Sequence, residues 1–252
     1  MSNRLEIRIL LTAVLFLIPI TAGLTFKVFL EAKEASSLST SVNAYSPPKD
    51  IGGLVEFVRE SLVTIKCLDV LGSGFSFGLD SYDVENGLEF RSAAAQNAPS
   101  VIVTNHHVVE KCLSTDMVEV VSIDGEKNSG EILEIDEVND LALVRIESEI
   151  WPLVGAGWKP NPGFWAMALG SPNGFDGSVT FGNVINFDST LVFHTASLSP
   201  GNSGGPLVDN EGFIYGVNTG SKPIGQNFNI SVGVNAFCDR LISCEQRKYW
   251  LD

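Results

Sequence analysis

Between residues 62 and 235 the sequence is a succession of short segments rich in Val, Ile, Leu and Phe, separated by Gly, Asn, Asp and Pro. Examples are SVIVTN, LALVRI, SVTFGNVI and ISVGVN. Strand-forming segments at this close spacing, with turn residues between them, are typical of an all-β sandwich or barrel. Two stretches have helical spacing instead: LVEFVRE at residues 54–60, and NAFCDRLISCEQRKYW at residues 235–250, which predicts a closing helix.

Composition narrows the class of partner. The chain has 252 residues, of which 44% are hydrophobic, so it can form one large domain or two lobes. Its net charge of −14 argues against nucleic acid as a partner, because binding a phosphate backbone needs clustered Lys and Arg.

The polar stretch at residues 79–100 has no strand pattern, and we expect a long exposed hairpin or loop there.

The N-terminal region predicts export. Arg4 and Arg8 precede an uncharged, mostly apolar run at residues 9–26. This is typical of a signal peptide, although the run also reaches the lower length limit for a membrane anchor. Residues 1–26 are therefore predicted to be a signal peptide or a membrane anchor. The rest of the protein would be periplasmic or extracellular, or held at the membrane through residues 9–26. The Ser-rich stretch at residues 27–50, which ends after two prolines, is typical of a linker.

The four cysteines agree with an oxidising compartment. Cys67, Cys112, Cys238 and Cys244 could form two disulfides, and three pairings are possible. Cys238 with Cys244 would close a short loop, and Cys67 with Cys112 a longer one. The alternative is that they are free, buried thiols. The sequence has no CxxC pair, so a zinc site or a thioredoxin-like site has little support.

The stretch SPGNSGGPLVD at residues 199–209 places Ser203 among three glycines. A nucleophilic serine needs an open approach path and backbone N–H groups that face the developing oxyanion, and glycines allow both. The alternative is a glycine-rich turn with a solvent-exposed serine.

A serine hydroxyl also needs a base, and the base needs a carboxylate that orients it. The adjacent His106 and His107 follow an apolar segment, and Asp140 precedes another one. Each residue alone has an ordinary structural explanation, since Asp140 could simply close a turn. Together with Ser203 they suggest a His-Asp-Ser catalytic triad.

Six segments carry a family resemblance in the family's order: VTIKCL to GSGFSFG, VIVTNHHVVE, ILEIDEVNDLALVRIE, AMALGSPNGFDGSVTFGNVI, HTASLSPGNSGGPLVD and IYGVNTG. Over about residues 60–220 the chain resembles trypsin-like (chymotrypsin-fold) serine proteases, and most of all the bacterial HtrA/Deg-type branch. The resemblance implies two six-stranded antiparallel β-barrels. Residues 51–155 would form the barrel with His107 and Asp140, and residues 156–252 the barrel with Ser203 and the closing helix, with a hydrophobic helix at the N-terminus.

The resemblance also implies the site residues. The family's base follows a Thr-x-x-His pattern, which runs here from Thr104 to His107 and leaves His106 with no catalytic role. Asp140 would orient the imidazole and Ser203 would attack the scissile carbonyl. The N–H groups of Gly201 and Ser203 would form the oxyanion hole. No metal or organic cofactor is expected, and a metal site built from the three histidines has no supporting motif.

The resemblance places Ser197, Asn218 and Gly220 near the walls of the primary substrate pocket. No Asp or Lys falls at its base, so we expect a small or medium apolar side chain to be preferred. Asn202 stands where the digestive members have the Asp that pairs with a newly cut N-terminus, so activation by that ion pair is not expected. The resemblance does not extend to the PDZ domain that is typical of the HtrA branch.

These observations predict an exported serine endopeptidase that acts on protein or peptide substrates, with a role in envelope protein quality control. Two alternatives are a catalytically silent binding protein on the same fold and a chaperone-like protein that holds unfolded chains. An intact His107, Asp140 and Ser203 favours the enzyme. The third histidine, His194, is predicted to be a partly buried strand residue with a satisfied ring, rather than a residue that lines the pocket.

Overall fold

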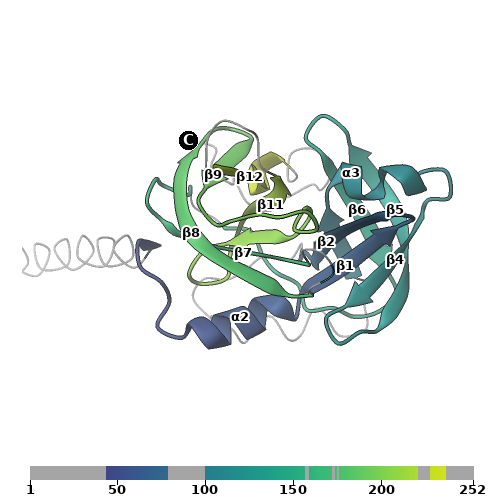
Figure 1. Ribbon diagram of the computed structural model, residues 1–252, viewed down its shortest axis with the longest axis horizontal. Coiled ribbons are helices and arrows are strands. Elements are labelled where there is room, and N and C mark those ends of the chain that lie inside the picture. The colour runs from purple at the N-terminus through teal and green to yellow at the C-terminus, as the bar shows by residue number, and fades with distance from the viewer. Residues whose placement is uncertain are drawn as a thin grey trace, which may run out of the picture. The chain divides into compact units, whose positions relative to one another are not determined.

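The computed structural model describes residues 44–78, 100–156, 159–171, 174, 176–220 and 228–236. The chain divides into two units, Met1–Ala44 and Tyr45–Asp252, and the second contains two closed six-stranded antiparallel barrels (Figure 1). The predicted all-β fold with two such barrels is confirmed. No helix in the described ranges is long and apolar enough to span a membrane. The predicted N-terminal hydrophobic segment, the polar stretch at 79–99 and most of the closing helix lie outside those ranges.

The first barrel is built from β1 to β6, in the order β1-β2-β3-β6-β5-β4. Its interior is filled by alternate side chains of these strands, mostly Val and Ile, as the period of two in a strand requires. The strands span Leu62–Cys67, Val70–Ser76, Ser100–Thr104, Met117–Ser122, Lys127–Asp136 and Leu141–Ile146.

The second barrel is built from β7 to β12, in the order β10-β11-β12-β9-β8-β7. Every strand segment predicted from the sequence falls on one of these strands or on a strand of the first barrel. The short β10 was not predicted, because its three residues directly follow the glycine-rich stretch. The strands span Trp165–Gly170, Ser178–Phe187, Leu191–His194, Pro206–Val208, Ile214–Gly220 and Asn229–Gly233.

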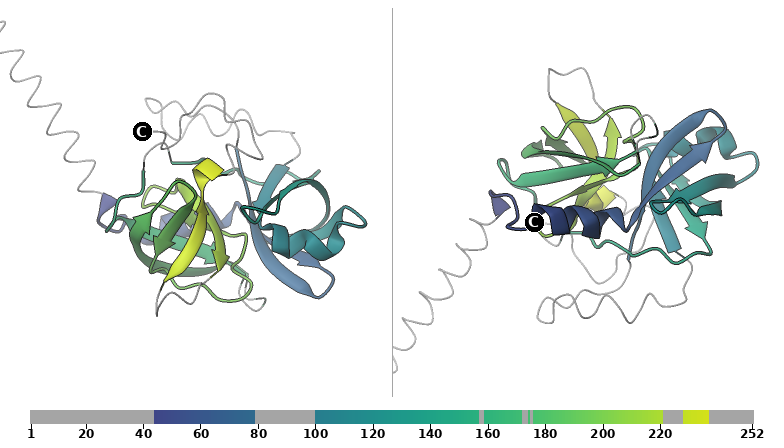
Figure 2. Two further views of the ribbon diagram at one scale, coloured as in Figure 1. Left: turned by 90° about the horizontal axis from the view of Figure 1, so that it is seen from above. Right: turned by 60° about the horizontal axis from the view of Figure 1, so that its bottom comes forward.

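The predicted first helix is present as α2, Ile51–Arg59, which runs along the second barrel and leads into β1 (Figures 1 and 2). It starts at Asp50, whose side chain accepts a hydrogen bond from the N–H of Gly53 at 2.9 Å. Its apolar face packs on the turn between β10 and β11. A Cβ atom at Gly212 would lie only 3.0 Å from Phe57 and 3.2 Å from Leu54. The helix thus covers one end of the second barrel.

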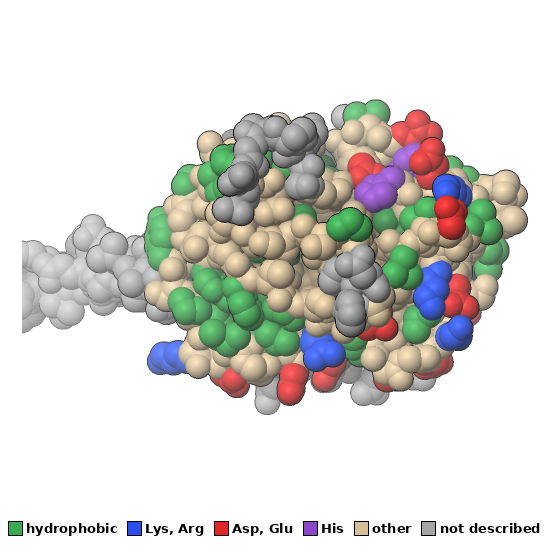
Figure 3. All heavy atoms as spheres, viewed as in Figure 1, with side chains coloured by type: hydrophobic (Ala, Val, Ile, Leu, Met, Phe, Trp, Pro, Cys, Tyr) green, Lys and Arg blue, Asp and Glu red, His purple; other side chains and the backbone are tan. Residues whose placement is uncertain are grey.

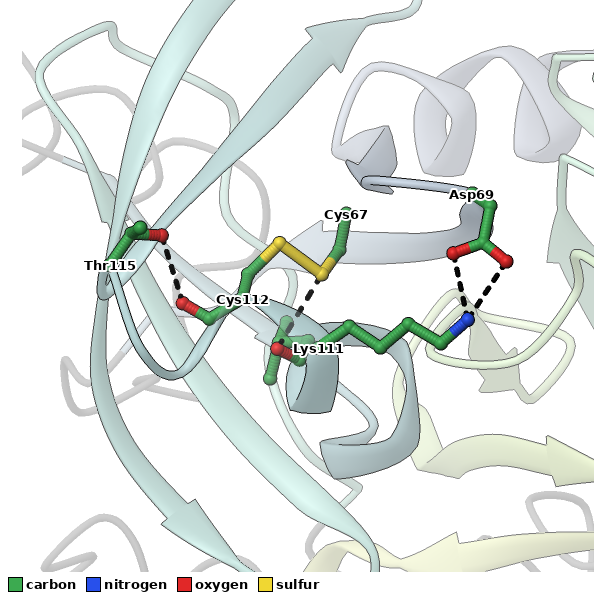
Figure 4. Close-up of a disulfide and its surroundings, with 6 residues drawn as sticks. Cys67, Asp69, Lys111, Cys112 and Thr115 are labelled. Carbon is green, nitrogen blue, oxygen red and sulfur yellow. Dashed lines mark hydrogen bonds and ion pairs between the residues drawn. A yellow bond between two sulfur atoms is a disulfide. The ribbon is translucent and has the colours of Figure 1, made fainter.

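A disulfide joins Cys67, the last residue of β1, to Cys112 (Figure 4). One of the candidate pairings is therefore confirmed, while Cys238 and Cys244 lie outside the described residues. Cys112 ends the short 3₁₀ helix η2, Glu110–Cys112, which follows the segment with the two histidines. The bond ties that segment to the barrel across a sequence separation of 45 residues. Closing a loop of that length disfavours the unfolded chain.

Asp209 is a buried carboxyl group in the turn after β10. Its Oδ1 accepts hydrogen bonds from the N–H groups of Glu211, at 2.8 Å, and Phe213, at 2.9 Å. Its Oδ2 has no hydrogen-bond partner among the described residues. Burial raises the pKa of Asp209 to about 7 and outweighs these hydrogen bonds, so the native protein keeps a proton that the unfolded chain releases near pH 4.

Because the native state binds this proton more tightly, Asp209 makes the free energy of unfolding fall as the pH rises from about 4 to about 7. Asp209→Asn keeps the Oδ1 acceptor and removes the titration. We compare the free energy of unfolding of this variant with that of wild type at each pH. We expect the difference to favour the variant by roughly 1–3 kcal/mol more at pH 8 than at pH 5. Urea unfolding at both pH values measures the difference, and an equal difference at the two pH values would contradict the expectation.

Candidate active site

His107 lies on a short helix directly after β3. This helix is α3, His106–Val109, which begins after Asn105 and was not predicted from the sequence. Val108 and Val109 are buried and hold the helix on the first barrel. His107 is exposed and His106 is half-buried, and the histidine side chains visible on this face lie beside acidic side chains (Figure 3).

Asp140 binds His107 through both its backbone and its ring. The ring Nδ1 lies 2.8 Å from Asp140 Oδ2 and 3.0 Å from Oδ1, and the His107 backbone N–H donates to Oδ1 at 3.0 Å. The carboxylate accepts the Nδ1 proton, which leaves the Nε2 atom of His107 able to take a proton from elsewhere. No hydrogen bond in the described residues joins His106 to Asp140.

A third segment also holds the Asp140 carboxylate, because the hydroxyl of Thr219 in β11 donates to Oδ2. Burial alone would raise the pKa of Asp140, but the hydrogen bonds from His107 and Thr219 outweigh it and hold that pKa below its ordinary value. The carboxylate is therefore ionised at neutral pH. This role of Thr219 could not be predicted from the sequence, because a threonine at a strand end carries no distinctive signal.

The backbone of Asp140 is in the left-handed region, with φ at 55°. A residue with a side chain adopts this conformation at a cost, and it persists where surrounding contacts fix it. Here the side-chain amide of Asn105 donates to the Asp140 carbonyl at 2.7 Å, and His107 and Thr219 hold the carboxylate. The turn between β5 and β6 thus turns the carboxylate of Asp140 toward His107.

Ser203 lies on a tight loop before β10. Gly201 and Gly204 have φ values of 102° and 88°, which favour glycine. A Cβ atom at Gly204 would lie 2.0 Å from the carbonyl oxygen of Ser73, so only glycine fits between the loop and β2. The glycines seen in the sequence therefore serve both the shape of the loop and its close contact with the first barrel.

The backbone N–H groups of this loop differ in whether they have a hydrogen-bond acceptor. Those of Asn202, Gly204 and Gly205 donate to the carbonyls of Ser199, Asn218 and Asn202, at 2.7–3.0 Å. The N–H groups of Gly201 and Ser203 have no acceptor among the described residues. These are the two donors that the family resemblance assigns to an oxyanion hole.

Contacts between the barrels bring the loop and the histidine together. Thr219 binds Asp140, and the preceding residue, Asn218, accepts from the N–H of Gly204 at 2.7 Å. Strand β11 thus holds both Asp140 and Gly204, the residue that follows Ser203. Within the described residues no hydrogen bond joins the Ser203 hydroxyl to His107. Such bonds are often loose in a protease without substrate.

The three pocket residues predicted from the sequence have different environments. Ser197 is exposed, while Asn218 is fully buried. The Asn218 amide donates to the carbonyls of Leu169 and Pro206, each at 3.1 Å, and its Oδ1 accepts from Ser231 at 2.9 Å. Gly220 lines a cavity of about 640 Å³, whose other lining residues include Asp140, Thr219, Leu191, Ile230 and Val232. Ser197 and Asn218 are not among the lining residues of this cavity.

His194 is fully buried at the end of β9. Its Nε2 lies 3.0 Å from the hydroxyl oxygen of Ser231, and that hydroxyl donates to Asn218. Burial lowers the pKa of His194 to about 4, so its ring is neutral at physiological pH. His194 therefore supports the strand pair β9 and β12, and its burial is even more complete than the sequence suggested.

The described geometry agrees with a known family. Residues 72–217 match the family model of the trypsin-like peptidase domain, which spans β2, the segment of His107, Asp140 and the loop of Ser203. The chain belongs to the trypsin-like peptidase family. Its relatives are HtrA- and DegP-like proteins, which confirms the resemblance seen in the sequence.

Among curated relatives, the putative serine protease HhoB of Synechocystis is 33% identical over 147 residues, which are 53% of this chain and 35% of that protein. A probable periplasmic serine endoprotease of DegP-like type from Chlamydia trachomatis is 33% identical over 160 residues, 57% of this chain and 31% of that protein. The chain thus spans about a third of the length of these relatives.

Solved structures show the same fold. The serine endoprotease from Yersinia pestis superposes with a TM-score of 0.63 at 20% identity, covering 79% of this chain and 68% of that one. The inactive form of the Rv3671c protease gives a TM-score of 0.62 at 21% identity, covering 79% of this chain and 97% of that one. At this level of identity, the likeness supports the fold alone.

Proposed function

We propose that this protein is a serine endopeptidase with His107, Asp140 and Ser203 as its catalytic triad. The observation that carries the proposal is the pairing of His107 with Asp140, with Nδ1 and Oδ2 2.8 Å apart, beside the Ser203 loop of a trypsin-like peptidase domain. A partly buried, oriented carboxylate that accepts the Nδ1 proton suits a histidine base.

In the proposed reaction, Nε2 of His107 takes the proton of the Ser203 hydroxyl as Oγ attacks the scissile carbonyl carbon. The ionised Asp140 stabilises the imidazolium that forms. His107 then protonates the leaving amine, and an acyl-enzyme on Ser203 remains. Water, activated by the same imidazole, cleaves the ester and restores the free hydroxyl.

The oxyanion of each tetrahedral intermediate is assigned to the N–H groups of Gly201 and Ser203. The support is that these two donors have no acceptor among the described residues, while their neighbours in the loop do. Removing one such donor from a protease of this chemistry costs about 2.7–4 kcal/mol of transition-state stabilisation. No metal or organic cofactor takes part in these steps.

We also propose that the protein is exported and cleaves other proteins in the cell envelope. Two observations support this: the basic and apolar sequence at residues 1–26, and relatives named as periplasmic serine endoproteases. The disulfide between Cys67 and Cys112 agrees with an oxidising compartment. Misfolded envelope proteins are the proposed substrates, which makes the role one of protein quality control.

For the residue before the scissile bond we propose a small or medium apolar side chain, in a pocket whose walls lie near Ser197, Asn218 and Gly220. The Asn218 amide is saturated by internal hydrogen bonds, so it offers little to a charged group. Cleavage of a peptide library derived from a whole proteome, read by mass spectrometry, tests both activity and preference. We expect at least about a tenfold enrichment of Ala, Val or similar residues over charged ones, from the free energy of burying a few methylene groups.

Charged residues dominating at that position would contradict the pocket assignment. The same experiment with Ser203→Ala separates this chain from contaminating proteases, because its own cleavages must disappear in that variant. If the wild-type protein and the variant cleave the same peptides to the same extent, the proposed activity itself is wrong.

A further inference from the structure

Ser73, in the middle of β2, lies where the first barrel meets the loop that carries Ser203. Its side chain is fully buried. Ser73 pairs with Thr64 of β1 on one side, whereas the pairing of β2 with β3 begins only at Phe75. On the side of β3, the N–H and carbonyl groups of Ser73 therefore make no backbone ladder bonds and are available to other groups.

Four hydrogen bonds use these groups. The N–H of Ser73 donates to the carbonyl of Ser203 at 2.7 Å, and its carbonyl accepts from the hydroxyl of Thr104 at 2.7 Å. The Ser73 hydroxyl donates to the carbonyl of Gly201 at 2.6 Å and accepts from the N–H of Ser171 at 2.8 Å. One residue thus binds the end of β3, the end of β7 and both residues assigned to the oxyanion hole.

The surroundings of this hydroxyl are tightly packed. A Cβ atom at Gly170 would lie 3.0 Å from Ser73 Oγ and 2.7 Å from the Cα atom of Asn202. A Cβ atom at Gly204 would lie 2.0 Å from the Ser73 carbonyl oxygen. If the hydroxyl were removed, the Gly201 carbonyl and the Ser171 N–H would lose a buried partner, which is costly for the conformation that needs it.

We propose that Ser73 is a positioning residue for the oxyanion hole. Gly201 has φ at 102° and no side chain, so its own conformational preferences do not fix the direction of its N–H group. The Ser73 hydroxyl fixes the Gly201 carbonyl, and the Ser73 N–H fixes the Ser203 carbonyl. These carbonyls belong to the peptide groups that follow Gly201 and Ser203. Holding them fixes the backbone on the C-terminal side of both residues and, through it, the directions of their own N–H groups. The inference rests on the proposed function.

Ser73→Ala tests this role, with Ser76→Ala as a matched control. Ser76 is also in β2, is buried, and its hydroxyl donates to a backbone carbonyl, that of Ile150, at 3.0 Å. Both variants remove one buried hydroxyl from the same strand, but only Ser73 contacts the loop. We expect kcat for a peptide substrate to fall about 10- to 100-fold in Ser73→Ala with KM within about twofold, because the hydroxyl acts on the transition state alone. Ser76→Ala should keep kcat within about twofold.

Equal kcat values in the two folded variants would overturn the proposal. A second readout does not depend on activity: amide hydrogen exchange of the peptide that covers residues 199–205. We expect faster exchange there in Ser73→Ala than in Ser76→Ala or wild type. Should the folded wild-type protein hydrolyse no peptide, the proposed function fails, and exchange alone decides on Ser73. Equal exchange in the two variants then rejects its role in holding the loop.

Ser73→Cys covers the case in which Ser73→Ala does not fold. A thiol fills the site at least as fully as the hydroxyl but is a weak hydrogen-bond donor. If the hydrogen bond to Gly201 matters, the kcat of this variant falls at least about threefold and exchange of the loop increases. If only the filled volume matters, Ser73→Cys retains wild-type values for both, and the proposal is rejected.

Discussion

Replacing Ser203 by alanine is expected to lower kcat for hydrolysis of an unfolded protein, such as reduced casein, by about 10⁶-fold. Without the hydroxyl no acyl-enzyme can form, and the remaining N–H donors give only the slow attack of water. The change should leave folding intact, because the hydroxyl has no hydrogen bond among the described residues. Release of acid-soluble fragments measures the activity, and circular dichroism checks the fold.

Ser129→Ala is a suitable control for this experiment. Ser129 is an exposed serine on β5 of the first barrel, so its removal changes composition in the same way without touching the Ser203 loop. Activity within about twofold of wild type is expected for it, as for other surface substitutions. A Ser203→Ala variant that still cleaved casein at more than about a hundredth of the wild-type rate would show that another nucleophile acts.

The second prediction concerns the effect on kcat of replacing each of the two adjacent histidines. His107→Ala should lower kcat by about 10⁵–10⁶-fold, because the Ser203 hydroxyl then has no base and Asp140 has no ring to orient. His106→Ala should change kcat by less than about threefold, since the ring next to Asp140 belongs to His107. The two substitutions remove the same side chain from adjacent positions of α3, so each is the matched control of the other.

The rate of casein hydrolysis over pH 5–9 separates the two histidines further. In the His106→Ala variant the pH profile should keep the wild-type shape, because His107 is still present as the base. The assignment of the base is one residue out of register if His106→Ala is inactive while His107→Ala remains active. Comparable losses in both variants would mean that the short helix itself, rather than one ring, carries the effect.

The strand pattern alone was sufficient to predict an all-β fold, because short apolar segments separated by Gly, Asn and Asp are compatible with few other fold classes. The pairing of strands into two barrels came from the family resemblance, since a local pattern does not specify which strand pairs with which. The sequence also did not reveal that His107 stands on a helical turn. That turn is stabilised by Val108 and Val109, which read equally well as the end of a strand.

In the candidate site, the proposed catalytic residues could be recognised from the sequence, but the residues that hold them in position could not. Ser203 stands out by its glycines and His107 by its spacing from Thr104. Thr219 and Ser73 are ordinary hydroxyl residues in strands, and their partners lie 79 and 128 residues away in the chain. Contacts of this kind depend on how the two barrels pack, which no local pattern encodes.

Covalent labelling with a fluorophosphonate probe, followed by mass spectrometry of the labelled peptide, tests the proposed active site most directly. The account predicts one probe per folded chain, attached to Ser203, with no labelling of Ser203→Ala and labelling slowed at least about a thousandfold in His107→Ala. A folded wild-type protein whose Ser203 takes up no probe would contradict the account, and would favour a catalytically silent binding or chaperone-like protein on the same fold.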